Sequence, residues 1–301
     1  MQDTIIIGAG ISGLTAAIYA ARKNMDFLII SENFGGQFNV SGEVVNYPGI
    51  VKTTGIEFSQ KMQEQMKFNN VDVKQEKAQK IEKINDNFKV KTDKGEYETK
   101  TIIIATGAKP RKLGVPGEAN YANKGVTYCS ICDGPLFSGK DVVIVGGGDA
   151  GMEAADFMIN IARKIYILDA AEKSIAHEYL VEKIQGHKRV EYINNAKIKE
   201  IYGNSMVKGL KYERDGEEHS LDVGGIIIEI GRIPDTGIFK GIVDLDEHNH
   251  IAIDCSGNTS QHGVFAAGDC ASGHEYQYVI AAGQGCMALL KAARYLAKKK
   301  N

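Results

Sequence analysis

Residues 4–17 read TIIIGAGISGLTAA, and this stretch decides the fold because it joins a strand, a glycine turn and a helix. A β-branched run leads into Gly8, Gly10 and Gly13, which form the pattern G-x-G-x-x-G. The first glycine permits a tight turn, the second lets a pyrophosphate approach the backbone, and the third lets helix and strand pack closely. Free amides at the helix N-terminus then face the phosphates. The stretch therefore predicts a dinucleotide-binding βα unit.

The chain that follows supplies the acid that such a unit requires. The run FLIIS at residues 27–31 predicts the next strand, and Glu32 follows it directly. A carboxylate at this position can accept hydrogen bonds from an adenosine ribose.

The same device recurs in the middle of the chain. Residues 141–158 read DVVIVGGGDAGMEAADFM and place Gly146, Gly148 and Gly151 between a strand and a helix. The next strand-like run, KIYILD, ends at Asp169. One glycine pattern alone is weak, but two copies with matching strands, helices and acids predict an α/β fold. They indicate two dinucleotide sites, or one site and a vestigial copy.

Composition narrows the class of protein. A chain of 301 residues with 43% hydrophobic content can form more than one domain. The net charge of -2 gives no sign of a nucleic-acid or anionic-membrane surface. No apolar run approaches the ~20 residues of a membrane span, and the first strand-like run begins at Thr4, which leaves no room for a signal peptide. We therefore expect a cytoplasmic protein without a membrane or nucleic-acid partner.

A cysteine pair lies between the two glycine patterns. Residues 127–137, TYCSICDGPLF, contain Cys129, Cys132 and Asp133. Zinc needs about four ligands, whereas the remaining cysteines stand alone, at Cys255, Cys270 and Cys286, so we expect no metal site. A structural disulfide would close too short a loop to stabilise much. The spacing and the adjacent acid favour a redox-active dithiol.

In this order the motifs resemble the low-molecular-weight thioredoxin reductases, over nearly the whole chain. Further landmarks are GGQF at 35–38, NYPG at 46–49, ATGA at 105–108, GRIPDT at 231–236, VFAAGDC at 264–270 and AAGQGCMAL at 281–289. The resemblance implies two Rossmann-like domains, the second inserted into the first. Residues 1–111 and 240–301 would form a discontinuous FAD-binding domain, and residues 112–239 a pyridine-nucleotide-type domain that carries the dithiol. Members of the family are homodimers whose two domains rotate about the connecting segments, and the resemblance implies the same for this chain.

The resemblance also implies FAD contacts. Asp269 would bind the ribityl chain, although a carboxylate there is also typical of an ordinary helix N-cap. The expected FAD residues are Gly8, Gly10, Gly13, Glu32, Gly36, Gln37, Asn46, Gly268, Asp269, Gln277 and Ala281, with Ala282 beside the last.

The same resemblance implies roles in the dithiol. Cys132 would exchange electrons with the flavin, and Cys129 would attack the disulfide of a thioredoxin-like protein. Cys132 would then resolve the mixed disulfide, with Asp133 as the general acid.

The electron donor is the open point. NADPH-dependent members carry H-R-R-x-x-x-R after the second nucleotide strand, whereas this chain reads ILDAAEKSIAH at residues 167–177. Asp169 replaces the histidine and suits the free 2′-hydroxyl of NADH. This pattern resembles the flavoprotein half of NADH-dependent alkyl hydroperoxide reductases. A second departure is Tyr276, where the family commonly has a basic residue. NADH is therefore favoured over NADPH, and the alternatives are reduced ferredoxin as donor, without any pyridine nucleotide, or a non-catalytic FAD/NAD sensor.

Overall fold

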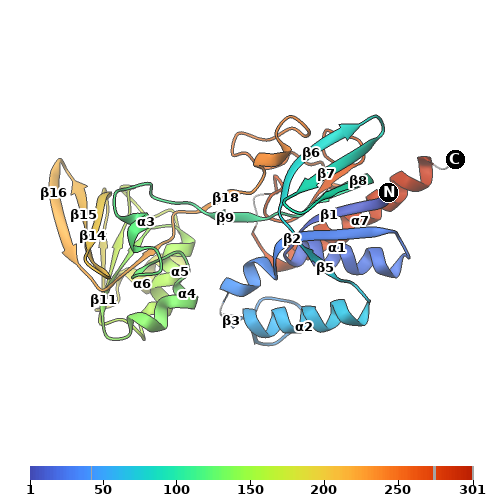
Figure 1. Cartoon of the computed structure of the whole chain (residues 1–301). Coiled ribbons are helices and arrows are strands. Elements are labelled where there is room, and N and C mark those ends of the chain that lie inside the picture. Colours follow the sequence, from blue (N-terminus) through green and yellow to red (C-terminus); the bar gives the residue numbers. More distant parts are fainter. Residues whose placement is uncertain (42, 274–275, 300–301) are drawn as a thin grey trace. The chain divides into compact units, whose positions relative to one another are not determined.

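The computed structural model describes residues 1–41, 43–273 and 276–299 (Figure 1). The chain divides into two compact units, residues 1–109 with 233–301, and residues 110–232. The second unit is thus an insertion in the first.

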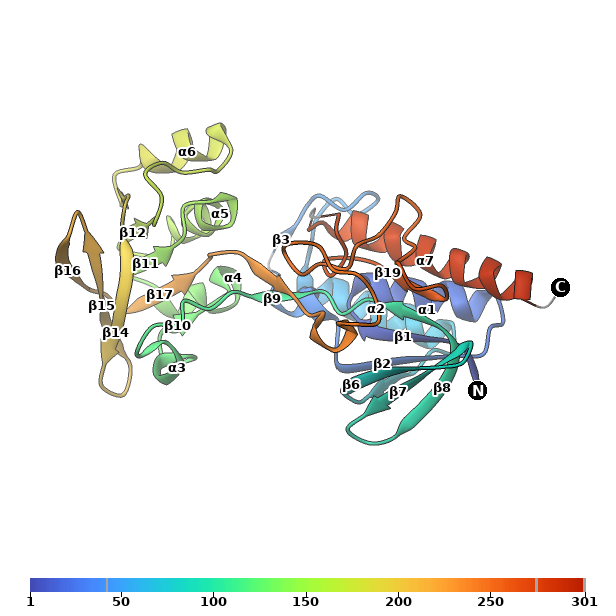
Figure 2. The ribbon, with the colours of Figure 1, turned by 90° about the horizontal axis from the view of Figure 1, so that it is seen from above.

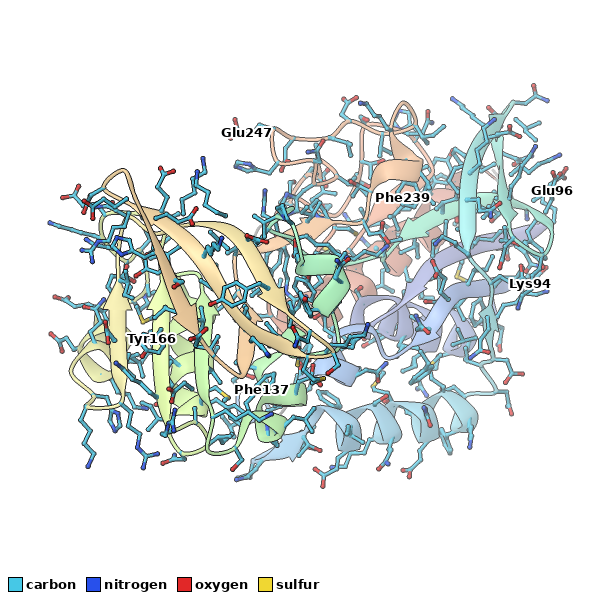
Figure 3. The ribbon with its side chains drawn as sticks, turned by 60° about the vertical axis from the view of Figure 1, so that its left-hand side comes forward. Lys94, Glu96, Phe137, Tyr166, Phe239 and Glu247 are labelled. Atoms are coloured by element: carbon cyan, nitrogen blue, oxygen red, sulfur yellow. The ribbon has the colours of Figure 1, made fainter. Side chains whose placement is uncertain are left out.

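The second boundary differs from the one expected at residue 240. Residues 233–239 belong to the first unit. Phe239, labelled in Figure 3, is fully buried in the core cluster that also contains Ile5 and Ile7. The Thr236 hydroxyl also donates a hydrogen bond to the Asn249 carbonyl, at 2.7 Å.

The first unit is built on a seven-stranded sheet with the order β5-β2-β1-β8-β7-β6, and β19 pairs with β8. The central strands are parallel, and β6, β7 and β8 form an antiparallel meander. The strands are β1 (Gln2–Ala9), β2 (Phe27–Phe34), β5 (Val73–Gln75), β6 (Ala78–Ile84), β7 (Asn87–Thr92), β8 (Glu96–Ile104) and β19 (Val264–Ala266).

Side chains alternate across this sheet and build a core on each face. In β1, Ile6 packs into a cluster with α1 (Ile11–Arg22), α2 (Gly55–Phe68) and α7 (Tyr278–Lys299), whereas Ile5 and Ile7 pack on the opposite face with Phe88 and Phe239. Helices α1 and α7 lie side by side (Figures 1 and 2).

The second unit has a parallel five-stranded sheet with the order β10-β17-β11-β12-β13. In β11, Val143 and Val145 face the antiparallel sheet β14-β15-β16, and Val142 and Ile144 face α5 and α6. The elements are β10 (Val126–Thr127), β11 (Asp141–Val145), β12 (Lys164–Leu168), β13 (Val190–Ile193), β14 (Lys197–Gly203), β15 (Val207–Arg214), β16 (Glu217–Asp222), β17 (Gly225–Ile228), α3 (Glu118–Tyr121), α4 (Ser130–Asp133), α5 (Asp149–Met158) and α6 (Glu178–Gln185).

The two connections between the units pair with each other as β9 (Ala108–Pro110) and β18 (Arg232–Pro234). The remaining short elements are β3 (Glu43–Val44), β4 (Thr53–Thr54) and the 3₁₀ turns Gly36–Val40, Gly134–Phe137 and Gly237–Phe239. Within the described ranges, no helix is long and apolar enough to cross a membrane. The predicted α/β class, with two Rossmann-like units, is confirmed.

Candidate functional site

The first glycine turn shows which of its glycines the fold requires. Gly8 has a φ of 109°, and a Cβ there would lie 2.2 Å from the Ala105 carbonyl oxygen. A Cβ at Gly13 would lie 1.9 Å from the Gly8 carbonyl oxygen, so α1 could not pack on the turn. Gly10, at the N-cap of α1, has no atom within 4 Å of its Cβ position. No steric contact therefore requires glycine at position 10. The missing side chain leaves open space where a ligand can approach the helix N-terminus.

A cavity of about 530 Å³ opens at this turn, entirely within the first unit. Seven of the predicted FAD residues line it, namely Gly8, Gly10, Glu32, Gly36, Gln37, Asp269 and Ala281. The other four lie outside the lining. Of these, Gly13 packs behind the turn, and the Asn46 side-chain amide donates to Gln277 Oε1 at 3.2 Å. The Gly268 amide donates to Gln284 Oε1 at 2.7 Å.

Asp269 lies in a turn between β19 and α7, which begins only at Tyr278. The alternative that Asp269 caps a helix is therefore wrong. The start of α7 is joined to the 3₁₀ turn after β2, because the Tyr278 hydroxyl donates to the Gln37 carbonyl at 3.1 Å. The Gln37 side chain in turn donates to the Ala108 carbonyl at 3.3 Å. Segments distant in sequence thus form one wall of the cavity.

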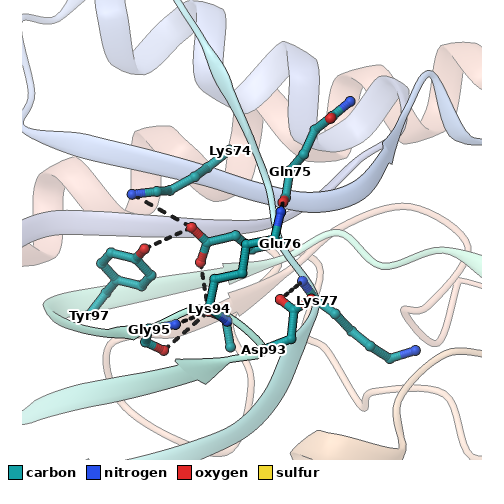
Figure 4. A network of polar contacts seen from close by, with 9 residues as sticks. Lys74, Gln75, Glu76, Lys77, Asp93, Lys94, Gly95 and Tyr97 are labelled. Atoms are coloured by element: carbon teal, nitrogen blue, oxygen red, sulfur yellow. Dashed lines mark hydrogen bonds and ion pairs between the residues drawn. The ribbon is translucent and has the colours of Figure 1, made fainter.

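At the end of β2, the acid Glu32 is paired with a lysine that sequence reasoning did not single out. Lys77 Nζ lies 2.9 Å from Glu32 Oε1, both side chains are about half exposed, and both line the cavity. The Lys77 amide donates to Asp93 Oδ1 at 2.8 Å, which holds the segment between β5 and β6 in place (Figure 4). Nothing local in the sequence signals this pairing, because Lys77 comes from the segment between β5 and β6, far along the chain from Glu32.

Glu76 is the buried centre of the network in Figure 4. Its carboxylate accepts hydrogen bonds from the Thr92 hydroxyl at 2.6 Å and the Tyr97 hydroxyl at 2.9 Å, and Lys74 Nζ lies 3.7 Å away. Burial by itself would raise the pKa of Glu76, but these hydrogen bonds and the nearby lysine charges lower it. Glu76 therefore stays ionised and fixes the cavity wall that carries Lys77.

These features fit a bound dinucleotide such as FAD. The open space at Gly10 and the N-terminus of α1 suit a pyrophosphate, and the carboxylate of Glu32 suits a ribose. Asp269 and Ala281 line the same cavity.

The second glycine turn repeats the geometry of the first. A Cβ at Gly146 would lie 2.1 Å from the Glu229 carbonyl oxygen, and one at Gly151 would lie 2.0 Å from the Gly146 carbonyl oxygen. Gly148 is again the open position, with Ile175 Cγ1 nearest at 3.8 Å. The turn therefore keeps a nucleotide-type shape.

Asp169 lies directly beside this turn and is only 8% exposed. It accepts a hydrogen bond from the Tyr192 hydroxyl at 2.6 Å and another from the Ala171 amide at 3.0 Å. Burial, and then the bond to Asp169, raises the pKa of Tyr192, so the phenol stays a donor. A Cβ at Gly147 would lie 1.9 Å from Asp169 Oδ2, so the middle glycine makes room for the acid. Sequence reasoning missed Gly147 and Tyr192.

The segment after Asp169 is bonded onto the glycine turn. The Ser174 hydroxyl donates to the Gly147 carbonyl, and the His177 amide donates to Asp149 Oδ1 at 2.7 Å. Ile175, one of the positions that lack the arginines of NADPH-dependent members, is 87% exposed.

The dithiol segment places Cys129 just before α4, and Cys129 is disulfide-bonded. The side chain of Cys132 lies outside the described residues. The Cys129 amide donates to the Thr127 hydroxyl at 3.2 Å, and that hydroxyl donates to Asp133 Oδ2 at 2.5 Å. Thr127, which sequence reasoning missed, thus bridges the backbone amide of Cys129 and the carboxylate of Asp133.

The other cysteines do not join this centre. Cys255, Cys270 and Cys286 carry free thiols, and burial raises the pKa of the Cys270 thiol. Among the described side chains, no group of His, Cys, Asp and Glu could hold a metal ion.

Glu229 is the residue directly after β17. Its carboxyl is partly buried, and the backbone of Ser130, the residue after Cys129, contributes to its electrostatic environment. Burial raises the pKa of Glu229 to about 7, against the attraction of Arg232. No motif in the sequence identified this residue.

Comparison with known proteins agrees with this geometry. Residues 2–285 match the family model described as pyridine nucleotide-disulphide oxidoreductase. The F component of the alkyl hydroperoxide reductase of Staphylococcus aureus (strain MSSA476) is 39% identical over 298 residues, which is 98% of this chain and 59% of that protein. The chain thus spans less than two thirds of that relative's length.

Two solved structures are also similar to this chain. Thioredoxin reductase of Lactococcus lactis is 33% identical with a TM-score of 0.92, over 99% of this chain and 100% of that one. A ferredoxin-flavin thioredoxin reductase from Clostridium acetobutylicum is also 33% identical, with a TM-score of 0.55, over 99% and 98%.

Proposed function

Because the chain belongs to the pyridine nucleotide-disulphide oxidoreductase family, we propose that it reduces the disulfide of a thioredoxin-like protein through FAD and the Cys129–Cys132 pair. The observation that carries this proposal is the arrangement around Thr127. Its hydroxyl joins the backbone of disulfide-bonded Cys129 to the carboxylate of Asp133. A thiol–disulfide exchange centre needs such a combination of sulfur and acid.

The flavin, when bound, supplies two-electron exchange between the donor and the dithiol. The amides at the N-terminus of α1 would bind its pyrophosphate, and Glu32, paired with Lys77, would accept from the adenosine ribose. Asp269 would bind the ribityl chain.

The dithiol performs the exchange with the protein substrate. In the reduced enzyme, the Cys129 thiolate attacks one sulfur of the partner's disulfide, a new S–S bond forms, and the partner's second sulfur leaves as a thiolate. Asp133, held by Thr127, supplies a proton to that leaving sulfur. Cys132 then gives up its proton and attacks the Cys129 sulfur of the mixed disulfide, so the Cys129–Cys132 bond re-forms and the partner's remaining sulfur leaves as a thiolate. That thiolate takes up the proton lost by Cys132, and the partner leaves as a dithiol.

NADH is the proposed donor because of Asp169. Its buried carboxylate already accepts from Tyr192 and Ala171, and each oxygen keeps a further lone pair for a ribose hydroxyl. A 2′-phosphate would bring like charge against a carboxylate that is 8% exposed, which is strongly unfavourable. NADPH is therefore the weaker candidate.

Reduced ferredoxin is the alternative donor, and the segment over the second turn favours it. Ser174 and His177 bond onto the turn at the helix N-terminus where a pyrophosphate would bind. A second turn closed in this way would be vestigial, and electrons would enter at the flavin.

The deciding experiment mixes the purified, oxidised flavoprotein anaerobically with NADH, NADPH or reduced ferredoxin and follows flavin absorbance. Rapid bleaching by NADH alone supports Asp169 as the ribose acid. Bleaching by ferredoxin and by neither nucleotide overturns the NADH assignment and supports the alternative. Preferential bleaching by NADPH contradicts both.

The dithiol is tested with Cys129→Ser, Cys132→Ser and the double variant. We expect all three to bind flavin and to lose reduction of thioredoxin by at least about 10³-fold, since no residual thiol pair remains. A double variant as fast as wild type refutes the proposed function. A wild-type protein that is reduced by its donor but reduces no protein disulfide indicates a sensor.

A further inference from the structure

A buried carboxylate ties the residue before Cys129 to the chain that enters the inserted unit. Glu118, the first residue of α3, is only 4% exposed. Its Oε1 accepts hydrogen bonds from the Tyr128 hydroxyl at 2.6 Å and the Leu113 amide at 3.0 Å, and its Oε2 accepts from the Gly114 amide at 2.7 Å. Three donors thus converge on one carboxylate, which joins the two segments.

The position of Glu118 is fixed by contacts with β14. The Ile201 amide donates to the Pro116 carbonyl at 2.9 Å, and a Cβ at Gly117 would lie 1.8 Å from the Ile201 carbonyl oxygen. Gly117 also has a φ of 85°, in the left-handed region that favours glycine. The turn before α3 therefore lies directly on β14, and backbone contacts hold the carboxylate in place.

Tyr128 is held through both its ring and its hydroxyl. Its side chain packs on the same core cluster as that of Leu113. Burial, and then the hydrogen bond to Glu118, raises the pKa of Tyr128, so the phenol stays a donor. The next residue, Cys129, is disulfide-bonded. The backbone at the entrance to the dithiol is therefore anchored by a side chain directly beside it.

We propose that Glu118 is a positioning residue of the dithiol, which clamps the segment before Cys129 and stabilises the disulfide form over the dithiol form. This inference rests on the proposed redox role of the Cys129–Cys132 pair. The clamp and the S–S bond order the same short segment, so the loss of conformational entropy is shared when both are present. Each therefore strengthens the other by the same factor.

Reduction of the disulfide loosens the clamp for the same reason. Two electrons from the donor and two protons convert the S–S bond into two thiols, and the segment before Cys129 is then ordered by the clamp alone. The Leu113 and Gly114 amides bond to the same carboxylate. The redox state of the dithiol thus reaches the chain that enters the inserted unit.

The test measures the disulfide–dithiol equilibrium of the flavin-loaded protein in anaerobic mixtures of reduced and oxidised glutathione. Two glutathione molecules supply two electrons and two protons to the S–S bond as they become glutathione disulfide. The samples are alkylated, and the peptide that carries Cys129 and Cys132 is quantified by mass spectrometry. Tyr128→Phe removes one hydroxyl and keeps the ring and Glu118. We expect its equilibrium constant for disulfide formation to fall about three- to tenfold, as for part of the entropy of fixing one residue.

Tyr202→Phe is the matched control, because it also removes a phenol that donates to a carboxylate, that of Asp222 at 2.8 Å. This pair joins β14 to β16 and shares none of its described hydrogen-bond partners with Tyr128. Its equilibrium constant should stay within about 1.5-fold of wild type. Glu118→Gln turns one acceptor oxygen into a donor that faces an amide, so it should act in the same direction as Tyr128→Phe and at least as strongly. If Glu118→Gln does not fold, Tyr128→Phe decides alone.

Hydrogen exchange of the Leu113 and Gly114 amides gives a second, reciprocal measurement on wild type. Reduction with dithiothreitol should speed exchange at these amides by about the same factor of three to ten. Exchange that is equal in the two redox states overturns the proposal.

A Tyr128→Phe equilibrium that equals that of wild type, or that moves toward the disulfide, also overturns the proposal, and so does an equal displacement in Tyr202→Phe. Because glutathione acts on the dithiol directly, these results do not depend on the donor or on the protein substrate. The expected displacement in a protein that reduces no thioredoxin-like substrate would overturn the proposed function alone.

Discussion

Substitution of Gly10 by alanine separates what the fold needs from what a ligand needs. Gly10 has φ -77° and ψ -176°, which any residue adopts, and no atom lies within 4 Å of its Cβ position. In the flavin-free protein, the new methyl group therefore meets nothing. Gly13→Ala is the contrasting change, because its Cβ would lie 1.9 Å from the Gly8 carbonyl oxygen.

The magnitudes follow from these contacts. At an N-cap, alanine is worse than glycine by up to about 1 kcal/mol, and a less flexible unfolded chain recovers about 0.4–1 kcal/mol. Gly10→Ala should therefore change the stability of the flavin-free protein by less than about 1 kcal/mol. A pyrophosphate on the α1 amides would meet the methyl group, and a steric conflict of about 1–3 kcal/mol weakens FAD binding roughly 5- to 150-fold.

The assay removes the flavin, measures unfolding in urea, and then titrates FAD back while its fluorescence is followed. Gly148→Ala is the matched variant, because Gly148 is the open position of the second turn. It should leave FAD affinity unchanged and weaken NADH binding by a similar factor. FAD affinity that is unchanged in Gly10→Ala would refute the placement of the pyrophosphate, whatever the stability result.

Three further predictions concern single side chains. Phe239→Ala removes a fully buried ring from the first unit and should lower its free energy of unfolding by about 3–5 kcal/mol. Flavin release on heating should therefore occur at a lower temperature. A second unfolding transition at an unchanged temperature would belong to the inserted unit. Glu229 has a folded pKa of about 7 against 4.5, so the fold favours its protonated form. The contribution of Glu229 to the free energy of unfolding should be full below about pH 4.5 and fall by up to about 3 kcal/mol as pH rises to 7, less the part that solvent screens. Glu229→Gln should flatten this pH dependence, measured as urea unfolding at pH 5 and pH 8. An unchanged pH dependence would contradict the assignment. Thr127→Val removes the hydroxyl between Cys129 and Asp133 and should slow thiol–disulfide exchange about tenfold without loss of flavin; an unchanged rate would show that Asp133 acts without it.

The site residues that could be predicted from the sequence are those that lie together in one short segment of the chain. Each glycine turn lies within one βα unit, so spacing alone located Gly8, Gly10 and Gly13, and the turn around Gly148 likewise. Cys129 and Asp133 were likewise found from one stretch. The boundary expected at residue 240 was displaced, because polar and glycine-bearing composition marks a connecting segment but not which core Phe239 enters.

The residues that sequence reasoning missed share a different property. Lys77 meets Glu32 from the segment between β5 and β6, and Tyr192 meets Asp169 from β13. The two residues of each pair are far apart in the sequence and are brought together only by the tertiary structure.

The sequence by itself determined the α/β class and the repeated glycine turns, because each rests on backbone torsions and side-chain periodicity within a few residues, and it predicted the Cys129–Cys132 pair from one short stretch. Only the tertiary structure decided which carboxylates are buried, which are paired and which lie beside the dithiol. Burial and charge depend on neighbours brought together by long-range strand pairing, and these neighbours set the pKa of a group such as Glu229.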